Sequence, residues 1–363
     1  MLRSSPLDFL LLISGLIETV APPSAPSPDD AAFTLARFVA SFEAFPCTET
    51  TAALRLVAAF SQDEDLRTHI GSTLAARRQP LPPWLAHLDD ACVDGDVLLV
   101  TDPLGDSSGY TFAVRMAGGV RFTVVVGVDH TVADAVREAM VVINSPEAVA
   151  ATSCEAIRLA SAIGGEPVVT HLDPGDARAV IEYAISQGDR VDPPFESPTW
   201  PANRALVEWA VGLLPPGGAV PVPPSWSDDD LHQIADTFFA STDGADFPSW
   251  VFGRFLDLAL RFAVTSRATD PLRWTPLTTK ALLDWALWSR LIDHDDAELL
   301  ADLLITWVPY TCRLRGVDPL IIDQVRDAVE QLADELVDLV DEVMTSEEEE
   351  WDEPEDHLCA RDS

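Results

Sequence analysis

The sequence predicts an α+β protein that is mostly α-helical, with a small antiparallel β-meander and a packed helix between two helical regions. Strand-like patterns are confined to residues 95–144. The rest of the chain repeats apolar residues at the three- and four-residue spacing of amphipathic helices. Hydrophobic residues make up 47% of the chain, which is enough to build folded cores. We therefore expect helical modules on both sides of one small sheet.

The predicted meander starts with the apolar run Asp96–Thr101, which a loop rich in turn-forming residues follows. Apolar and polar residues then alternate through Tyr110–Met116 and again through Val120–Val128, which is the period of a half-buried strand. Ala117–Gly119 lies between these two runs, and its glycines accept the positive φ of a hairpin turn. We therefore expect three strands, antiparallel at least at the hairpin.

A helix is expected directly after the last of these strands. Its apolar face would carry Val132, Val136 and Ala139, and its polar face Asp134, Arg137 and Glu138. Asp129 or Thr131 is placed to cap this helix, because the side-chain oxygens of Asp and Thr accept hydrogen bonds from the unpaired backbone N–H groups of a helix start. The meander and this helix define the predicted domain 80–144.

The first 79 residues are predicted to form an α-helical module. Helices are expected over residues 6–20, 29–45, 48–60 and 63–78, with a proline-rich linker at 21–28. The apolar run Leu7–Ile17 follows Arg3 and resembles a signal peptide, but Asp8 interrupts it and it is too short to span a bilayer. A buried helix is the better interpretation of this run.

Residues 145–344 are predicted to form an α-helical C-terminal domain. Helices are expected at about residues 146–162, 174–187, 201–214, 228–238, 247–265, 276–288, 297–307 and 319–343, several of them opened by proline or by an acidic cap. Residues 345–363 are dominated by Glu and Asp. We predict that they form a disordered acidic tail.

The formal net charge of the chain is −37 at pH 7. So acidic a chain argues against binding to nucleic acid, which depends largely on Lys and Arg, and against docking on anionic membranes. Basic protein partners, metal ions and cationic ligands are compatible with this charge, but the simpler interpretation is that it only confers solubility. The five cysteines are scattered and form no C-x-x-C pair, which fits a reducing cytoplasm better than a disulfide framework. The sequence leaves the oligomeric state open.

Five polar residues are predicted to meet near the end of the last meander strand. They are Asp102, Asp106, Asp129, His130 and Asp134. Carboxylate and imidazole groups suit a divalent metal ion, so these residues are the candidate metal ligands. The simpler interpretation is structural, with Asp129 as a helix cap and the others as turn residues. No cofactor is expected unless the metal interpretation holds.

Other patterns in the sequence carry less chemistry. Residues 293–296 read Asp-His-Asp-Asp, which fits the acidic start of a helix better than a cation site. Most of the ten tryptophans are expected in the core. The chain lacks G-x-G-x-x-G, Walker, G-x-S-x-G and H-E-x-x-H motifs. Ser107 and Ser108 are expected near His130, but a serine triad needs an oriented base that the sequence does not show.

Three stretches resemble a family of uncharacterised actinobacterial proteins. They are Pro82-Pro-Trp84 with the meander and its turn Asp102–Asp106, Val128-Asp129-His130 with the helix expected after it, and Asp270-Pro-Leu-Arg-Trp-Thr-Pro276 with the helix Leu282–Trp285 behind it. The helical pair at residues 52–76 also fits, so the resemblance spans most of residues 29–343. After His130 the family tends to read Asn-Leu-Gly-Gly, whereas this chain has Thr-Val-Ala-Asp, and Arg137-Glu138 replaces a Lys-Asp pair. The resemblance implies a shared arrangement of modules and no activity.

We predict a non-catalytic cytoplasmic protein that works through contacts with a protein partner and has an interaction or regulatory role. The basis is the absence of catalytic motifs, the helical modules and the acidic tail. The alternative is a metal-dependent hydrolase that uses Asp129 and His130. The hydrolase requires the loop Asp102–Asp106 to reach His130, whereas the interaction protein does not.

Overall fold

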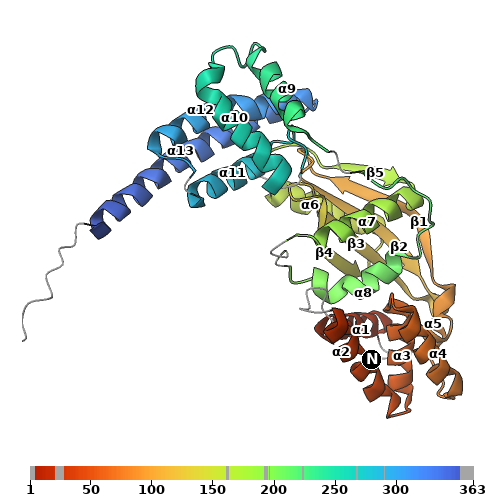
Figure 1. Cartoon of the computed structure of the whole chain (residues 1–363). Coiled ribbons are helices and arrows are strands. Elements are labelled where there is room, and N and C mark those ends of the chain that lie inside the picture. Colours follow the sequence, from red (N-terminus) through yellow and green to blue (C-terminus); the bar gives the residue numbers. More distant parts are fainter. Residues whose placement is uncertain are drawn as a thin grey trace, which may run out of the picture. The chain divides into compact units, whose positions relative to one another are not determined.

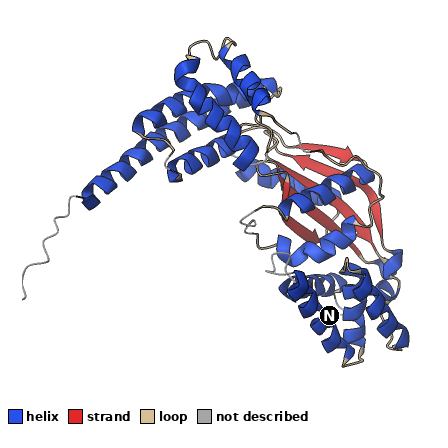
Figure 2. Cartoon of the chain, in the orientation of Figure 1, coloured by secondary structure: helices blue, strands red, loops and turns tan. Residues whose placement is uncertain are grey.

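The described residues form one five-stranded antiparallel sheet, and most of their other segments are helical (Figure 2). The computed structural model describes residues 5–20, 28–160, 163–191, 195, 197–222, 225–266, 269–289 and 291–351. About 60% of the chain is helical, so the predicted mostly helical α+β class is confirmed. Among the described residues, no helix is both long enough and apolar enough to cross a membrane.

The sheet has the strand order β4-β3-β2-β1-β5, with every neighbouring pair antiparallel. Its strands are β1 (Cys92–Thr101), β2 (Ser107–Arg115), β3 (Arg121–Asp129), β4 (Ala135–Val142) and β5 (Val168–Leu172). The three predicted strands correspond to β1, β2 and β3. The predicted hairpin turn is also present, with positive φ at Gly118 and Gly119.

The prediction of a helix after Asp129 is wrong, because the chain forms strand β4 there. A tight turn at residues 130–134 reverses the chain, and β4 then pairs with β3 from Thr123↔Val142 to Asp129↔Ala135. The apolar spacing of residues 132–139 fits a helix, but pairing with the valine-rich β3 overrides that local preference. The short strand β5 was not expected at all. It follows Gly164-Gly165 and precedes Asp173-Pro174, so its apolar run is too brief to stand out.

Two compact units make up the chain. Unit 1 comprises residues 1–161 and 166–223, and unit 2 comprises residues 162–165 and 224–363. This division differs from the predicted boundaries at 79/80 and 144/145, and it places a boundary inside the predicted domain 145–344. The reason is long-range packing, which linker composition does not reveal.

Helices of unit 1 cover both faces of its sheet, and the N-terminal helices gather beside one end of it (Figure 1). They are α1 (Pro6–Val20), α2 (Pro28–Glu43), α3 (Thr48–Phe60), α4 (Glu64–Ala76), α5 (Pro83–Ala86), α6 (Pro146–Ala160), α7 (Pro174–Gly188) and α8 (Trp200–Val211). Helices α7 and α8 bury one face of the sheet, while α6 packs on the opposite face through Ala150 and Cys154 against Leu98 and Val100.

One continuous apolar core joins the N-terminal helices to the sheet. Leu10 of α1, Leu54 of α3, Phe112 of β2 and Leu206 of α8 are all fully buried members of it. The buried Ser14 hydroxyl on α1 also accepts a hydrogen bond of 3.2 Å from the backbone N–H of Leu206. The first 79 residues therefore belong to the same core as the sheet and do not form a module of their own.

Unit 2 is helical. Its helices are α9 (Asp228–Phe239), α10 (Ser249–Arg261) with a π-turn at Phe262–Ser266, α11 (Pro276–Trp288), α12 (His294–Leu314) and α13 (Pro319–Trp351). Trp274 and Trp307 are buried in its interior, as expected of core tryptophans. Residues 345–351 continue α13, in contrast to the predicted disordered tail, because glutamate is a good helix former. Residues 352–363 of the predicted tail lie outside the described residues.

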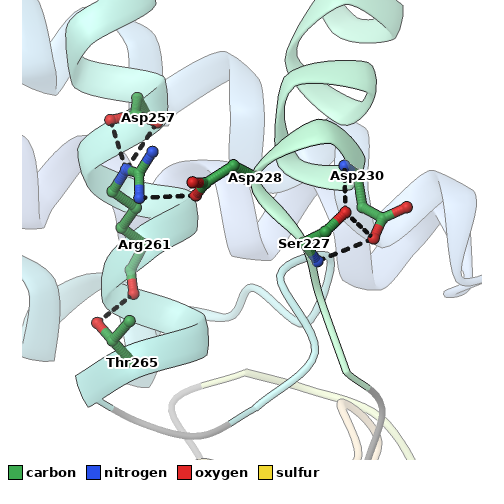
Figure 3. A network of polar contacts seen from close by, with 6 residues as sticks. All are labelled: Ser227, Asp228, Asp230, Asp257, Arg261 and Thr265. Carbon is green, nitrogen blue, oxygen red and sulfur yellow. Dashed lines mark hydrogen bonds and ion pairs between the residues drawn. The ribbon is translucent and has the colours of Figure 1, made fainter.

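A polar network joins the first turn of α9 to α10 (Figure 3). The Arg261 Nε atom lies 3.0 and 2.9 Å from the two carboxylate oxygens of Asp257, and its Nη1 atom lies 2.9 Å from Asp228 Oδ1 on α9. The Ser227 hydroxyl accepts from the backbone N–H of Asp230, whose carboxylate accepts in return from the Ser227 N–H. This capping box starts α9.

We predict that Leu10→Ala lowers the free energy of unfolding of unit 1 by about 2–5 kcal/mol, because it leaves a cavity in the shared core. Denaturant unfolding followed by circular dichroism measures this loss. Leu12→Ala in the same helix is the matched control. Leu12 is partly exposed, so its loss should stay below about 0.5 kcal/mol. Equal effects of the two substitutions would contradict the shared core.

Candidate functional site

The loop between β1 and β2 reaches the end of β3. The backbone N–H of His130 donates a hydrogen bond of 2.8 Å to the carbonyl oxygen of Asp106. The five predicted ligand residues therefore come from chain segments that meet at one end of strands β2 and β3. The carboxylates of Asp102, Asp129 and Asp134 nevertheless have different partners.

Asp102 is a turn residue. Its carboxylate accepts hydrogen bonds from the N–H of Leu104 at 2.9 Å, from the hydroxyl of Ser107 at 3.0 Å and from the N–H of Ser107. These contacts close the tight loop between β1 and β2. The structural interpretation of Asp102 thus agrees with its surroundings.

Asp129 stabilises a turn and does not cap a helix. Its buried carboxylate accepts from the Thr131 N–H at 2.8 Å, from the Thr131 hydroxyl at 2.6 Å and from Arg137 Nη1 at 3.1 Å. The acceptor contact to the second residue ahead is an Asx-turn. Because β4 replaces the expected helix, there are no helix N–H groups for Asp129 to accept from.

The predicted metal ligands do not share a coordination site. Within the described ranges, no group of three or more His, Cys, Asp or Glu side chains is placed to hold a metal ion. Asp102 and Asp129 are occupied by the contacts above, and both ring nitrogens of His130 contact other side chains. The metal site stays a prediction without support from this geometry.

The structure instead places His130 between a serine and an aspartate. His130 Nε2 lies 2.8 Å from Ser108 Oγ, and His130 Nδ1 lies 2.6 Å from Asp134 Oδ1. We call these three residues the Ser108 relay. The sequence predicted Ser108 near His130 but did not show how the His130 ring is oriented, because its contacts require the β2–β3 pairing Ser108↔Val128 and the turn after β3.

The turn after β3 aims Asp134 back at His130. Ala133 and Asp134 have φ values of 55° and 53°, a left-handed conformation that is uncommon for residues other than glycine. The charge of Asp134 also acts on two tyrosines nearby. Burial and then this charge raise the pKa of Tyr110 to about 12, and the same two causes raise the pKa of Tyr183 on α7. The phenols of both tyrosines therefore stay protonated at neutral pH.

Exposure increases along the relay. Ser108 is 6% exposed, the His130 side chain 16% and the Asp134 side chain 44%. The arrangement can transfer a proton from the Ser108 hydroxyl to His130. It can equally serve as a set of hydrogen bonds that fastens the β3–β4 turn to β2.

The second acidic cluster is a helix start. Asp293 is the N-cap of α12, and its carboxylate accepts from the Asp296 N–H at 2.9 Å. Asp296 itself pairs with Arg254 of α10. The predicted acidic helix start is confirmed.

Two tryptophans of unit 2 lie on its surface and not in the core. Trp250 on α10 is 87% exposed and Trp288 at the end of α11 is 86% exposed. Unit 2 also carries most of the excess charge, since residues 224–363 hold 32 Asp and Glu against 10 Arg and Lys, a net charge of −22. Exposed indole rings on an acidic surface were not expected from the sequence.

Comparison of the chain with protein-family models, curated proteins and solved structures found no match. The resemblance to actinobacterial proteins therefore stays a prediction.

We predict that Asp129→Ala lowers the free energy of unfolding by about 1–3 kcal/mol, because it leaves the buried Thr131 N–H and hydroxyl without their acceptor. Asp129→Asn keeps an oxygen acceptor and should lose less. Denaturant unfolding with and without a chelator measures both variants. Asp96→Ala removes an exposed carboxylate from β1 and serves as the control. A chelator effect on the parent protein that disappears in both Asp129 variants would restore the metal site.

Proposed function

We propose that this chain is a cytoplasmic protein whose unit 2 acts without catalysis and binds a basic protein partner. The observation that supports this function is the near-complete exposure of Trp250 and Trp288. Covering an exposed tryptophan removes a large apolar surface from contact with water. Tryptophan is also enriched among the residues that dominate binding energy at protein interfaces.

The charge of unit 2 selects the kind of partner. A net charge of −22 in 140 residues repels acidic surfaces and attracts basic ones at long range. On the described part of α13, the exposed acids are Asp323, Asp327, Glu330, Asp334 and Glu335. A partner that presents Lys and Arg around an apolar contact would complement both features.

The thiol state of the cysteines supports a reducing compartment. Among the described residues, Cys47, Cys92, Cys154 and Cys312 form no disulfide, and intracellular thiols are normally kept reduced. For the alternative function, a metal-dependent hydrolase at Asp129 and His130, the loop Asp102–Asp106 does reach His130. Among the described residues, however, no three His, Cys, Asp or Glu side chains are grouped to hold a metal ion.

We predict that the double variant Trp250→Ala/Trp288→Ala loses its protein partner. Full-length protein is immobilised and exposed to lysate of the source organism, and each retained protein is then purified and titrated. The affinity of the parent protein should fall as salt is added, and the double variant should bind about 30-fold or more weakly, as for loss of a hot-spot tryptophan.

Val222→Ala is the matched control, because Val222 is an equally exposed apolar residue that lies in unit 1. It should bind as the parent protein does. Circular dichroism checks that the double variant keeps its helices. A partner that binds the folded double variant with unchanged affinity would contradict the proposed surface.

A further inference from the structure

We propose that Ser108 is a nucleophile activated by His130, and that unit 1 hydrolyses small carboxylic esters. This activity is independent of the binding function proposed for unit 2. It rests on the Ser108 relay, which joins β2 to the turn between β3 and β4.

The contacts of His130 determine which ring nitrogen carries the proton. An ionised carboxylate only accepts hydrogen bonds, so the contact of 2.6 Å to Asp134 requires a proton on Nδ1. In neutral imidazole, Nε2 is then an acceptor, and at 2.8 Å its donor is the Ser108 hydroxyl. This is the tautomer that a general base for a serine nucleophile needs.

The backbone holds all three residues in place without a ligand. Ser108 is paired on both sides in the sheet, with Thr101 of β1 and Val128 of β3. The N–H of His130 is fixed by the Asp106 carbonyl. Asp134 is held by a turn in which two consecutive residues are left-handed. Such preorganisation lowers the barrier of a reaction, because less order has to be gained in the transition state.

The surroundings of Ser108 limit the size of the substrate. Ser108 is 6% exposed, and Tyr110 lies two residues further along the same strand face. The C-terminal end of α7 approaches β4 closely, since a Cβ atom on Gly188 would lie 3.5 Å from the Val136 carbonyl oxygen. A short acyl group, such as acetyl, fits these limits better than a long chain.

The proposed reaction has two steps. The Ser108 oxygen attacks the ester carbonyl carbon while its proton moves to His130 Nε2, and the alcohol then leaves with that proton, which gives acyl-Ser108. Water next attacks the acyl carbon and gives its proton to His130, after which the carboxylic acid leaves and the proton returns to the Ser108 oxygen. Bonds and protons balance over the two steps, and no oxidant or reductant takes part.

Asp134 acts here as a positioning residue. Its side chain is 44% exposed, so water screens its charge more than it would in a buried site. The main contribution of Asp134 is to keep the proton on Nδ1. Asp134→Asn should therefore slow the acylation of Ser108 less than His130→Gln does.

The test is covalent labelling of the full-length protein with a fluorophosphonate probe, with the labelled serine located by mass spectrometry. We expect label on Ser108 and a burst of p-nitrophenol from p-nitrophenyl acetate. His130→Gln should slow labelling about 100-fold or more, as for loss of a general base. Labelling of the parent protein should also slow as the pH is lowered, because protonated His130 cannot accept a proton.

Ser107→Ala is the matched control, because Ser107 precedes Ser108 but its hydroxyl contacts Asp102. It should label like the parent protein, whereas Ser108→Ala should not label at this position. Thermal unfolding checks each variant, and the pH dependence of the parent protein stands in for His130→Gln if that variant does not fold. Absence of label on Ser108 in folded parent protein, or labelling at a rate independent of pH and His130, would overturn the proposal. Neither result affects the test of the tryptophans in unit 2.

Discussion

Strand β3 is the element on which the rest of unit 1 depends. Its residues Phe122–Val126 are all buried, so both of its faces are covered. A strand of this kind also needs hydrogen-bonding partners on both edges, because its backbone groups lie away from water. Strand β2 supplies one edge and β4 the other. The requirement for β4 is the reason why the chain turns back directly after Asp129.

The geometry of the Ser108 relay follows from this reversal. Residues 130–134 must return the chain within five residues, and the turn does so by placing Ala133 and Asp134 in the left-handed region. That conformation brings the carboxylate of residue 134 to the ring of residue 130. Asp129 supports the same turn from its other side through Thr131 and Arg137. The pairing of β3 with β4 thus accounts for the buried hydrogen bonds of Asp129 and for the orientation of the His130 ring.

Local patterns in the sequence were sufficient for features that depend on neighbouring residues. The hairpin at Gly118-Gly119, the helix starts at Asp173 and Asp293, and most helices are of this kind. Strand β4 was not predictable in this way, because residues 132–139 fit a helix and only contact with β3 decides between the two structures. The core that residues 1–79 share with the sheet was not predicted for the same reason. The burial of Leu10 depends on residues about two hundred positions away. The Ser108 relay was not predictable for the same reason, because Ser108 and His130 meet only after the register of β2 and β3 is set.

The alternation of side chains along β2 explains why only one of two adjacent serines takes part. Successive residues of a strand point to opposite faces, so Ser107 turns toward Asp102 and Ser108 toward His130. A register shift of one residue would exchange them and would also bring the buried Tyr110, Phe112 and Val114 to the other face. The apolar core therefore selects the register, and the register selects Ser108. The same packing that stabilises the core therefore also places Ser108 beside His130.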